Sequence, residues 1–128
     1  MTGVLYNAGP LIVLGKLNRL ELLAELYGEM QVPRAVYEEA VTQGLALGMT
    51  DARTMQLFWQ AKGWPIIEVA IDMLSAYKPP VILDPGEAEV LALAQTLADT
   101  LVLLDDETAR AEARRLKLPV RGTLGVLA

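Results

Sequence analysis

The sequence contains no cysteine and no histidine among its 128 residues. Without cysteine, the chain can form no disulfide, thiolate nucleophile or zinc–sulfur site. Without histidine, it can supply no imidazole base, no Ser-His-Asp triad and no imidazole metal ligand. The lack of cysteine suits the reducing cytoplasm, where we expect the protein to act. The side chains left for catalysis are therefore mostly carboxylates.

Long apolar runs and a basic charge balance are also missing. No apolar stretch approaches the roughly 18 residues that a membrane-spanning helix needs, and no basic segment precedes the apolar N-terminal stretch as in a secretory signal. We therefore expect no membrane partner. The net charge of −5 argues against a broad surface that coats nucleic acid, but it leaves room for a local basic patch.

Length and composition fit a single domain over residues 1–128, since 53% of the residues are hydrophobic and can form a sizeable core. Short apolar strands, expected at 4–6, 30–32, 66–70, 101–104 and 119–121, alternate with helical patterns. The helices are expected at 9–14, 18–28, 33–43, 51–61, 85–98 and 107–116, with loops at 44–50 and 79–80. This alternation predicts an α/β fold in three layers, a mostly parallel central sheet flanked by helices.

Polar side chains follow two of the predicted strands directly. Asn7 ends the first strand, and Asp105 and Asp106 end the most apolar one. Ligands of parallel sheets bind beyond the carboxyl ends of the strands, so these residues are candidates for a site. The alternative is that Asp105 or Asp106 only caps the helix that follows.

Helical spacing selects two further acids. Glu87 shares a helix face with the apolar residues Val90 and Leu91, whereas Glu89 points toward a polar face. Glu87 can also form a capping box with Asp84, which predicts a structural role that does not exclude a functional one.

The pair Glu38 and Glu39 divides in the same way. Glu38 follows Arg34 by four residues, which predicts a surface ion pair. Glu39 lies on the packed face, so it is the better candidate for a site. Solvated helix charges are the alternative for both.

Carboxylates that converge repel one another unless a cation or protons neutralise them. A metal site explains such convergence, and hard oxygen ligands favour Mg²⁺ or Mn²⁺. Two such ions about 3.5–4 Å apart activate a water molecule and stabilise the leaving oxygen in phosphodiester hydrolysis. That chemistry needs neither histidine nor cysteine.

The motifs together resemble the PIN domains, the fold of the VapC-type toxin ribonucleases. The resemblance rests on a GEAE segment at 86–89, an LLDD segment at 103–106 and further stretches at 4–17, 32–39 and 118–127. It implies catalytic residues Asn7, Glu39, Glu87, Asp105 and Asp106, with Asn7, Glu87, Asp105 and Asp106 as ligands of Mg²⁺ or Mn²⁺. Most members have Asp where this chain has Asn7, so the resemblance implies an RNA-cleaving activity impaired at that position.

The resemblance also implies partners. PIN toxins are commonly homodimers that bind RNA and a cognate antitoxin, and relatives continue beyond the final helix, so we expect this chain to lack a C-terminal extension. Two other functions are consistent with the residues. One is a catalytically inactive PIN domain that binds RNA or protein, and the other is an unrelated receiver-like domain with Asp105 as phosphoryl acceptor. The second is disfavoured because a receiver needs an acidic pair where this chain has Asn7.

The bases are concentrated near the C-terminus. Residues 107–121 carry five basic and two acidic side chains. We predict that Arg110, Arg114 and Arg121 contact RNA phosphates. The alternative is a solvated helix whose arginines pair with Glu107 and Glu112.

Overall fold

Five short strands, all paired in parallel, form the centre of the molecule. The computed structural model describes residues 3–17, 19–27, 31–97 and 99–123. One sheet has the order β1-β4-β5, and β2 pairs with β3. A bridge between Leu5 and Gln31 places the two sheets edge to edge. The strands are β1 (Gly3–Tyr6), β2 (Val32–Pro33), β3 (Ile66–Ile67), β4 (Thr100–Leu103) and β5 (Val120–Arg121).

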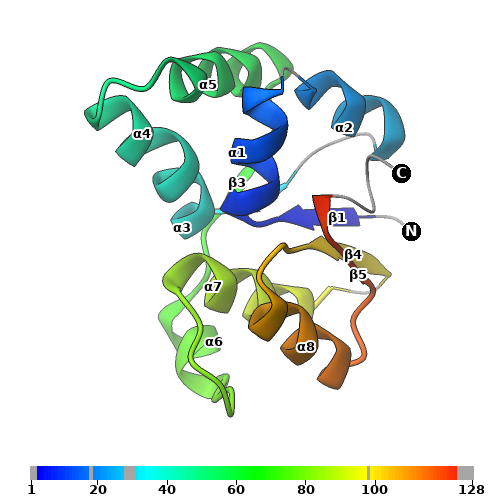
Figure 1. Ribbon diagram of the computed structural model, residues 1–128. Helices are drawn as coiled ribbons and strands as arrows, with labels where there is room; N and C mark the ends of the chain where they lie inside the picture. Colours follow the sequence, from blue (N-terminus) through cyan, green and yellow to red (C-terminus); the bar gives the residue numbers. More distant parts are fainter. Residues whose placement is uncertain (1–2, 18, 28–30, 98, 124–128) are drawn as a thin grey trace.

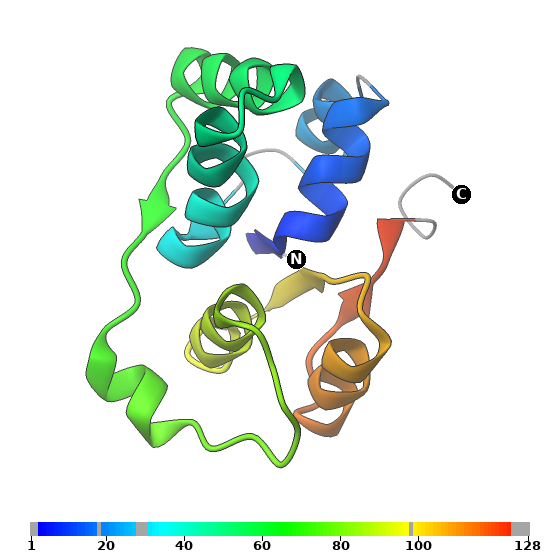
Figure 2. The same cartoon turned by 60° about the vertical axis from the view of Figure 1, so that its left-hand side comes forward.

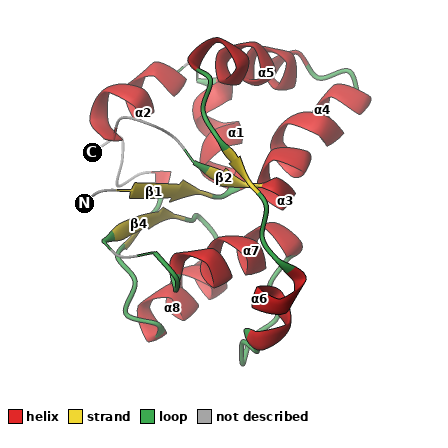
Figure 3. Ribbon diagram, turned by 180° about the vertical axis from the view of Figure 1, so that it is seen from behind, coloured by secondary structure: helices red, strands yellow, loops and turns green. Residues whose placement is uncertain are grey.

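Helices cover both faces of these strands, which confirms the predicted α/β fold (Figure 1). On one side lie α1 (Ala8–Lys16), α2 (Leu20–Tyr27), α3 (Arg34–Tyr37), α4 (Gln43–Ala46) and α5 (Thr50–Lys62). On the other side lie α6 (Ile71–Ala76), α7 (Pro85–Ala94) and α8 (Glu107–Arg115). Figure 3 shows β1 and β4 side by side between the two groups. No helix in the described part of the chain is long and apolar enough to cross a membrane.

Strand β4 is fully buried, as its composition predicts. All four of its residues are buried, with β1 on one side and β5 on the other. Burying each of its leucine or valine side chains contributes about 1.5–3 kcal/mol. Because β1 pairs in register with β4, Tyr6 opposite Leu103, both strands end at the same level.

Helix α7 is buried on nearly all sides, and this overturns the predicted polar face. Ala92 is only 2% exposed because α6 packs against that side of the helix. Glu89 does not point to solvent, since its Oε1 accepts a hydrogen bond from the backbone N–H of Ala35. The helix also ends at Ala94, short of the predicted residue 98, and residue 98 itself lies outside the described part.

The segment from 34 to 46 is one continuous helical path, longer than predicted. It passes from α3 through a π-helical turn, η1 (Glu38–Thr42), into α4. The predicted loop at 44–50 is therefore partly helical, because Gly44 allows close packing against Ala52 of α5. Pro33 is not the first helical residue but belongs to β2 and precedes the helix.

The segment between β3 and α7 runs along the outside of the molecule (Figure 2). Strand β3 is shorter than the predicted 66–70, and α6 forms where the sequence predicts no regular element. Both ends of the helix predicted at 18–28 and the start of the strand predicted at 30–32 lie outside the described residues, as do residues 124–127 of the stretch at 118–127.

Candidate functional site

Asn7 lies at the carboxyl end of β1 and occupies the N-cap position of α1 without capping it. Its backbone N–H donates to Leu103 of β4, which fixes the residue beside the end of that strand. The residue is only 6% exposed, and its Oδ1 accepts no hydrogen bond from the described residues. A buried oxygen without a donor is costly, by about 1–3 kcal/mol, so its position calls for an explanation.

The oxygen of Asn7 faces the start of α7. A Cβ atom at Gly86 would lie 3.1 Å from Asn7 Oδ1 and 3.5 Å from Asp84 Oδ1. The absence of a side chain at Gly86 therefore lets Asn7 Oδ1 and Asp84 Oδ1, together with a methyl group of Val36 at 3.4 Å, approach the start of α7 closely.

Asp84 and Glu87 form the predicted capping box at the start of α7. Asp84 Oδ1 accepts from the Glu87 backbone N–H at 2.7 Å, and Glu87 Oε1 accepts from the Asp84 N–H at 3.0 Å. Glu87 is also only 7% exposed, on the apolar face that its spacing predicted. The cap uses one oxygen of each carboxylate and leaves the second oxygen of each outside the capping box.

Glu39 reaches the same region from the π-helical turn η1. Such turns are rare and frequently occur at functional sites. Burial, followed by the charge of Asp84, raises the pKa of Glu39.

Arg34 forms its ion pair with Glu68 at 2.8 Å instead of the predicted pair with Glu38.

Four acids therefore share one electrostatic environment. Burial raises the pKa of Glu87, and the charges of Asp84, Asp106 and Glu39 add to that effect, while the hydrogen bond from the Asp84 backbone opposes it. Two predicted site acids, Glu39 and Asp106, thus lie near enough to Glu87 to disfavour its ionisation. We call Glu39, Asp84, Glu87 and Asp106, together with Asn7, the acidic edge.

Asp105 belongs to the same end of the sheet, but its carboxylate is already bound. Its Oδ1 accepts from the backbone N–H of Thr123 and its Oδ2 from the Thr123 hydroxyl, both at 2.6 Å. Asp106 caps α8 by accepting from the Ala109 N–H at 2.9 Å, so the capping alternative holds for Asp106. Asp105 therefore fastens the start of the C-terminal segment to the end of β4.

The predicted basic residues lie on α8 and β5, and Arg110 is the one shown close to Asp105. A Cβ atom at Gly122 would lie 2.9 Å from Arg110 Nη1 and 3.1 Å from Asp105 Oδ1. Glu107 pairs with Arg110 at 3.5 Å and with Arg114 at 3.2 Å. Arg110 and Arg114 thus form ion pairs with Glu107, as the interpretation of a solvated helix predicts. Both arginine side chains remain partly exposed.

The acidic edge fits a divalent cation by its donor chemistry. It offers hard oxygens only, and Asn7 Oδ1 is a buried oxygen that still needs a positive partner. No group of three or more acids among the described residues is already gathered tightly enough to hold an ion. Mutual repulsion keeps uncompensated carboxylates apart, so a cation would have to draw them together.

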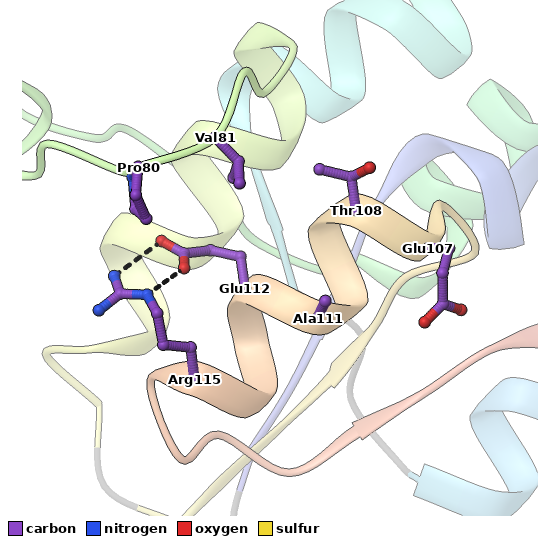
Figure 4. A pocket seen from close by; sticks show the side chains of 7 residues that line it. All are labelled: Pro80, Val81, Glu107, Thr108, Ala111, Glu112 and Arg115. Atoms are coloured by element: carbon purple, nitrogen blue, oxygen red, sulfur yellow. Dashed lines mark hydrogen bonds and ion pairs between the residues drawn. The ribbon is translucent and has the colours of Figure 1, made fainter.

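A larger hollow, of about 420 Å³, lies between the 80–81 segment and α8 (Figure 4). Its polar floor is Glu112, whose side chain is 1% exposed and is bound by Arg115 and by the Tyr77 hydroxyl. The hydrogen bond from Arg115 is the main cause that lowers the pKa of Glu112. The hollow contains none of the acidic-edge residues and its carboxylate is satisfied, so it is not the candidate site.

Glu87→Gln should stabilise the protein at neutral pH in the presence of a chelator, by roughly 1 kcal/mol. Because the pKa of Glu87 is raised in the folded protein, its ionised form lowers the free energy of unfolding at pH 7. This destabilisation is absent when the pH is below 4.5, the ordinary pKa of a glutamate. It grows as the pH rises from 4.5 through the raised pKa of Glu87. Glutamine removes the charge and keeps the N3 cap.

The measurement is the free energy of unfolding in urea at pH 7 and below pH 4.5. We expect the gain of Glu87→Gln at pH 7 to disappear at the lower pH. Glu25→Gln makes the same chemical change on an exposed face of α2 and is the matched control. An equal gain at both pH values would contradict the raised pKa.

Two residues of this region are not predicted as site residues by the sequence. The spacing predicts Asp84 only as a cap, and Thr123 only as part of a helical turn. The signal for Asp84 is its place one turn from Glu87 at a helix start, but its approach to Asn7 depends on the packing of α7 against β1. No sequence signal links Thr123 to Asp105.

Comparison with known proteins relates the chain to a protein family. A family model described as a PIN domain matches residues 3–128. No curated protein matches the chain.

Proposed function

The chain belongs to the PIN-domain family, and on that premise we propose that it is an Mg²⁺- or Mn²⁺-dependent endoribonuclease with activity impaired by Asn7. The fold is nuclease-like. The observation that carries the proposal is the buried oxygen of Asn7, which has no donor and lies at the carboxyl end of β1 beside the start of the helix that carries Glu87. This is where open parallel sheets bind their ligands.

Glu87, Asp106 and Asn7 are the residues that would hold the cation, with Asp105 beside them. A bound Mg²⁺ or Mn²⁺ supplies an activated water and neutralises charge on the phosphate. Glu39, whose pKa is raised by burial, would be the residue that accepts a proton from the attacking water. Asp105 binds Thr123 and thereby fixes the position of the segment that carries Arg121. Arg110 of α8 lies beside this segment, at Gly122.

The arginines supply the complementary charge for RNA. Arg110 lies beside Gly122 and Asp105, so a phosphate bound there would be close to the acidic edge. From the resemblance, we further propose a toxin–antitoxin role, a homodimer and a cognate antitoxin as partners.

A second function is favoured by the same side chains. Asn7 is neutral, Asp105 is bound to Thr123, and the cap uses one oxygen each of Asp84 and Glu87. These features suit a PIN domain that has lost cleavage and acts by binding RNA or protein.

Cleavage of a labelled single-stranded RNA, with Mn²⁺ or with EDTA, separates the two functions. The first predicts weak cleavage that needs Mn²⁺ and is lost in Glu87→Gln but kept in Glu25→Gln. RNA binding without cleavage would favour the second. Equal cleavage by the native protein and Glu87→Gln would point to a contaminating nuclease and overturn the first.

Arg114→Glu should weaken RNA binding and reduce its dependence on salt. Arg114 is half exposed, and reversing its charge removes a phosphate contact, which lowers the slope of log K against log[salt] by about 1. The measurement is fluorescence anisotropy of labelled RNA across a salt series. Arg53→Glu on α5 carries the same charge change and should bind more like the native protein; equal losses would mean that only net charge matters.

A further inference from the structure

Asp84 is the acid whose charge acts on both glutamates of the acidic edge. Its charge contributes to the raised pKa of Glu39 and of Glu87, which come from η1 and α7. The residue itself is exposed, so solvent and ions can reach it. Its Oδ1 lies 2.7 Å from the backbone nitrogen of Glu87, so Asp84 adjoins Glu87 although its spacing indicates only a helix cap.

The second observation is the direction of Asn7. A capping Asn would direct its oxygen to the N–H groups of its own helix, but the side chain of Asn7 makes no such bond. Its Oδ1 is instead buried without a donor, beside the position that a Gly86 Cβ would take and on the same side as Asp84 Oδ1. Asn7 Oδ1 is thus a buried oxygen without a donor next to an acidic residue, and a positive charge bound there would satisfy it.

The cap leaves Asp84 able to bind a cation. The capping box uses its Oδ1, as acceptor of the Glu87 N–H, and a carboxylate has about four lone-pair sites. Asp105, in contrast, has both oxygens bound by Thr123.

We infer that Asp84 is a cation-binding residue of the acidic edge and supplies the negative charge that Asn7 lacks. The inference rests on the proposed metal dependence and deepens it. In this arrangement Asn7 gives a neutral oxygen, Asp84 gives a carboxylate, and the missing side chain at Gly86 allows both to approach the same point.

Titration calorimetry with MnCl₂ tests the inference on the native protein and on Asp84→Asn. Asparagine caps helices as well as aspartate does, so the variant removes charge with little loss of fold. Melting temperatures in EDTA verify this. We expect Asp84→Asn to weaken Mn²⁺ binding about tenfold or more. Asp72→Asn, an exposed acid in the first turn of α6, is the control and should bind as the native protein does.

The double variant Asn7→Asp with Asp84→Asn sharpens the test. If Asp84 compensates for Asn7, moving the carboxylate to position 7 restores binding to about the native level. Native-like binding by Asp84→Asn would overturn the inference and leave the metal-dependent nuclease standing. No Mn²⁺ binding by the native protein would also overturn it. Loss of binding in Asp84→Asn, with no RNA cleavage by any variant, would support the cation site and reject the nuclease.

Discussion

Asn7→Asp should increase Mn²⁺ affinity and RNA cleavage by about 10–100-fold. The change adds a full charge where the native chain has only an amide oxygen, at the carboxyl end of β1. Two unit charges 4 Å apart interact by about 4 kcal/mol at an effective dielectric of 20, and desolvation and repulsion from neighbouring acids reduce this gain.

The same substitution should destabilise the metal-free protein. A carboxylate at a position that is 6% exposed would lie beside Asp84 and near Glu87, without a donor for its oxygen. Leaving such a group unsatisfied costs about 1–3 kcal/mol or more. The melting temperature of Asn7→Asp should therefore be below the native value in EDTA and should rise on addition of Mn²⁺ more than that of the native protein.

Thermal melts with EDTA or Mn²⁺, together with the RNA assay, provide both measurements. Asn7→Ala is the control, because it removes the amide without adding charge and should gain neither affinity nor activity. If Asn7→Asp changes neither property, Asn7 is not the cause of weak activity and position 7 does not contribute to a cation site.

Gly44→Ala should destabilise the fold by about 1–3 kcal/mol, although alanine is the better helix former. A Cβ atom at Gly44 would lie 2.6 Å from the Cβ of Ala52, well inside contact distance, and both atoms are fixed to helix backbones. Helices α4 and α5 would have to move apart. The same helical path carries Glu39, so its position at the acidic edge would be disturbed as well.

A compensating variant tests this explanation. Gly44→Ala combined with Ala52→Gly moves the methyl group from α5 to α4 and removes the clash, and the new glycine in α5 costs about 0.5–1 kcal/mol. Urea unfolding should show the double variant to be more stable than Gly44→Ala alone. If the two are equally unstable, contact with Ala52 is not the reason for glycine at this position.

The features that the sequence predicted correctly are those set by neighbouring residues. Strand β4 follows from an uninterrupted apolar run, and the capping box of α7 follows from Asp, Pro and Glu at fixed spacing. Asp106 caps α8 in the same way, by a hydrogen bond three residues along the chain. These bonds form within one turn, so their spacing alone specifies them.

The features that the sequence missed depend on packing between distant segments. The polar face predicted for Ala92 is buried because α6 covers it, and Glu89 binds a backbone N–H 54 residues away. The predicted loop at 44–50 is partly helical because α5 packs closely at Gly44.

For the acidic edge, the sequence alone determined the residue types, that is, an Asn after β1 and acids at the starts of α7 and α8. Only the tertiary structure decided how they are used. It turned Asn7 away from its own helix toward Asp84, and it bound Asp105 to Thr123, 18 residues further along. The physical reason is that helical and strand spacing fixes which face a side chain occupies, whereas its partners across the sheet are set by the packing of the layers.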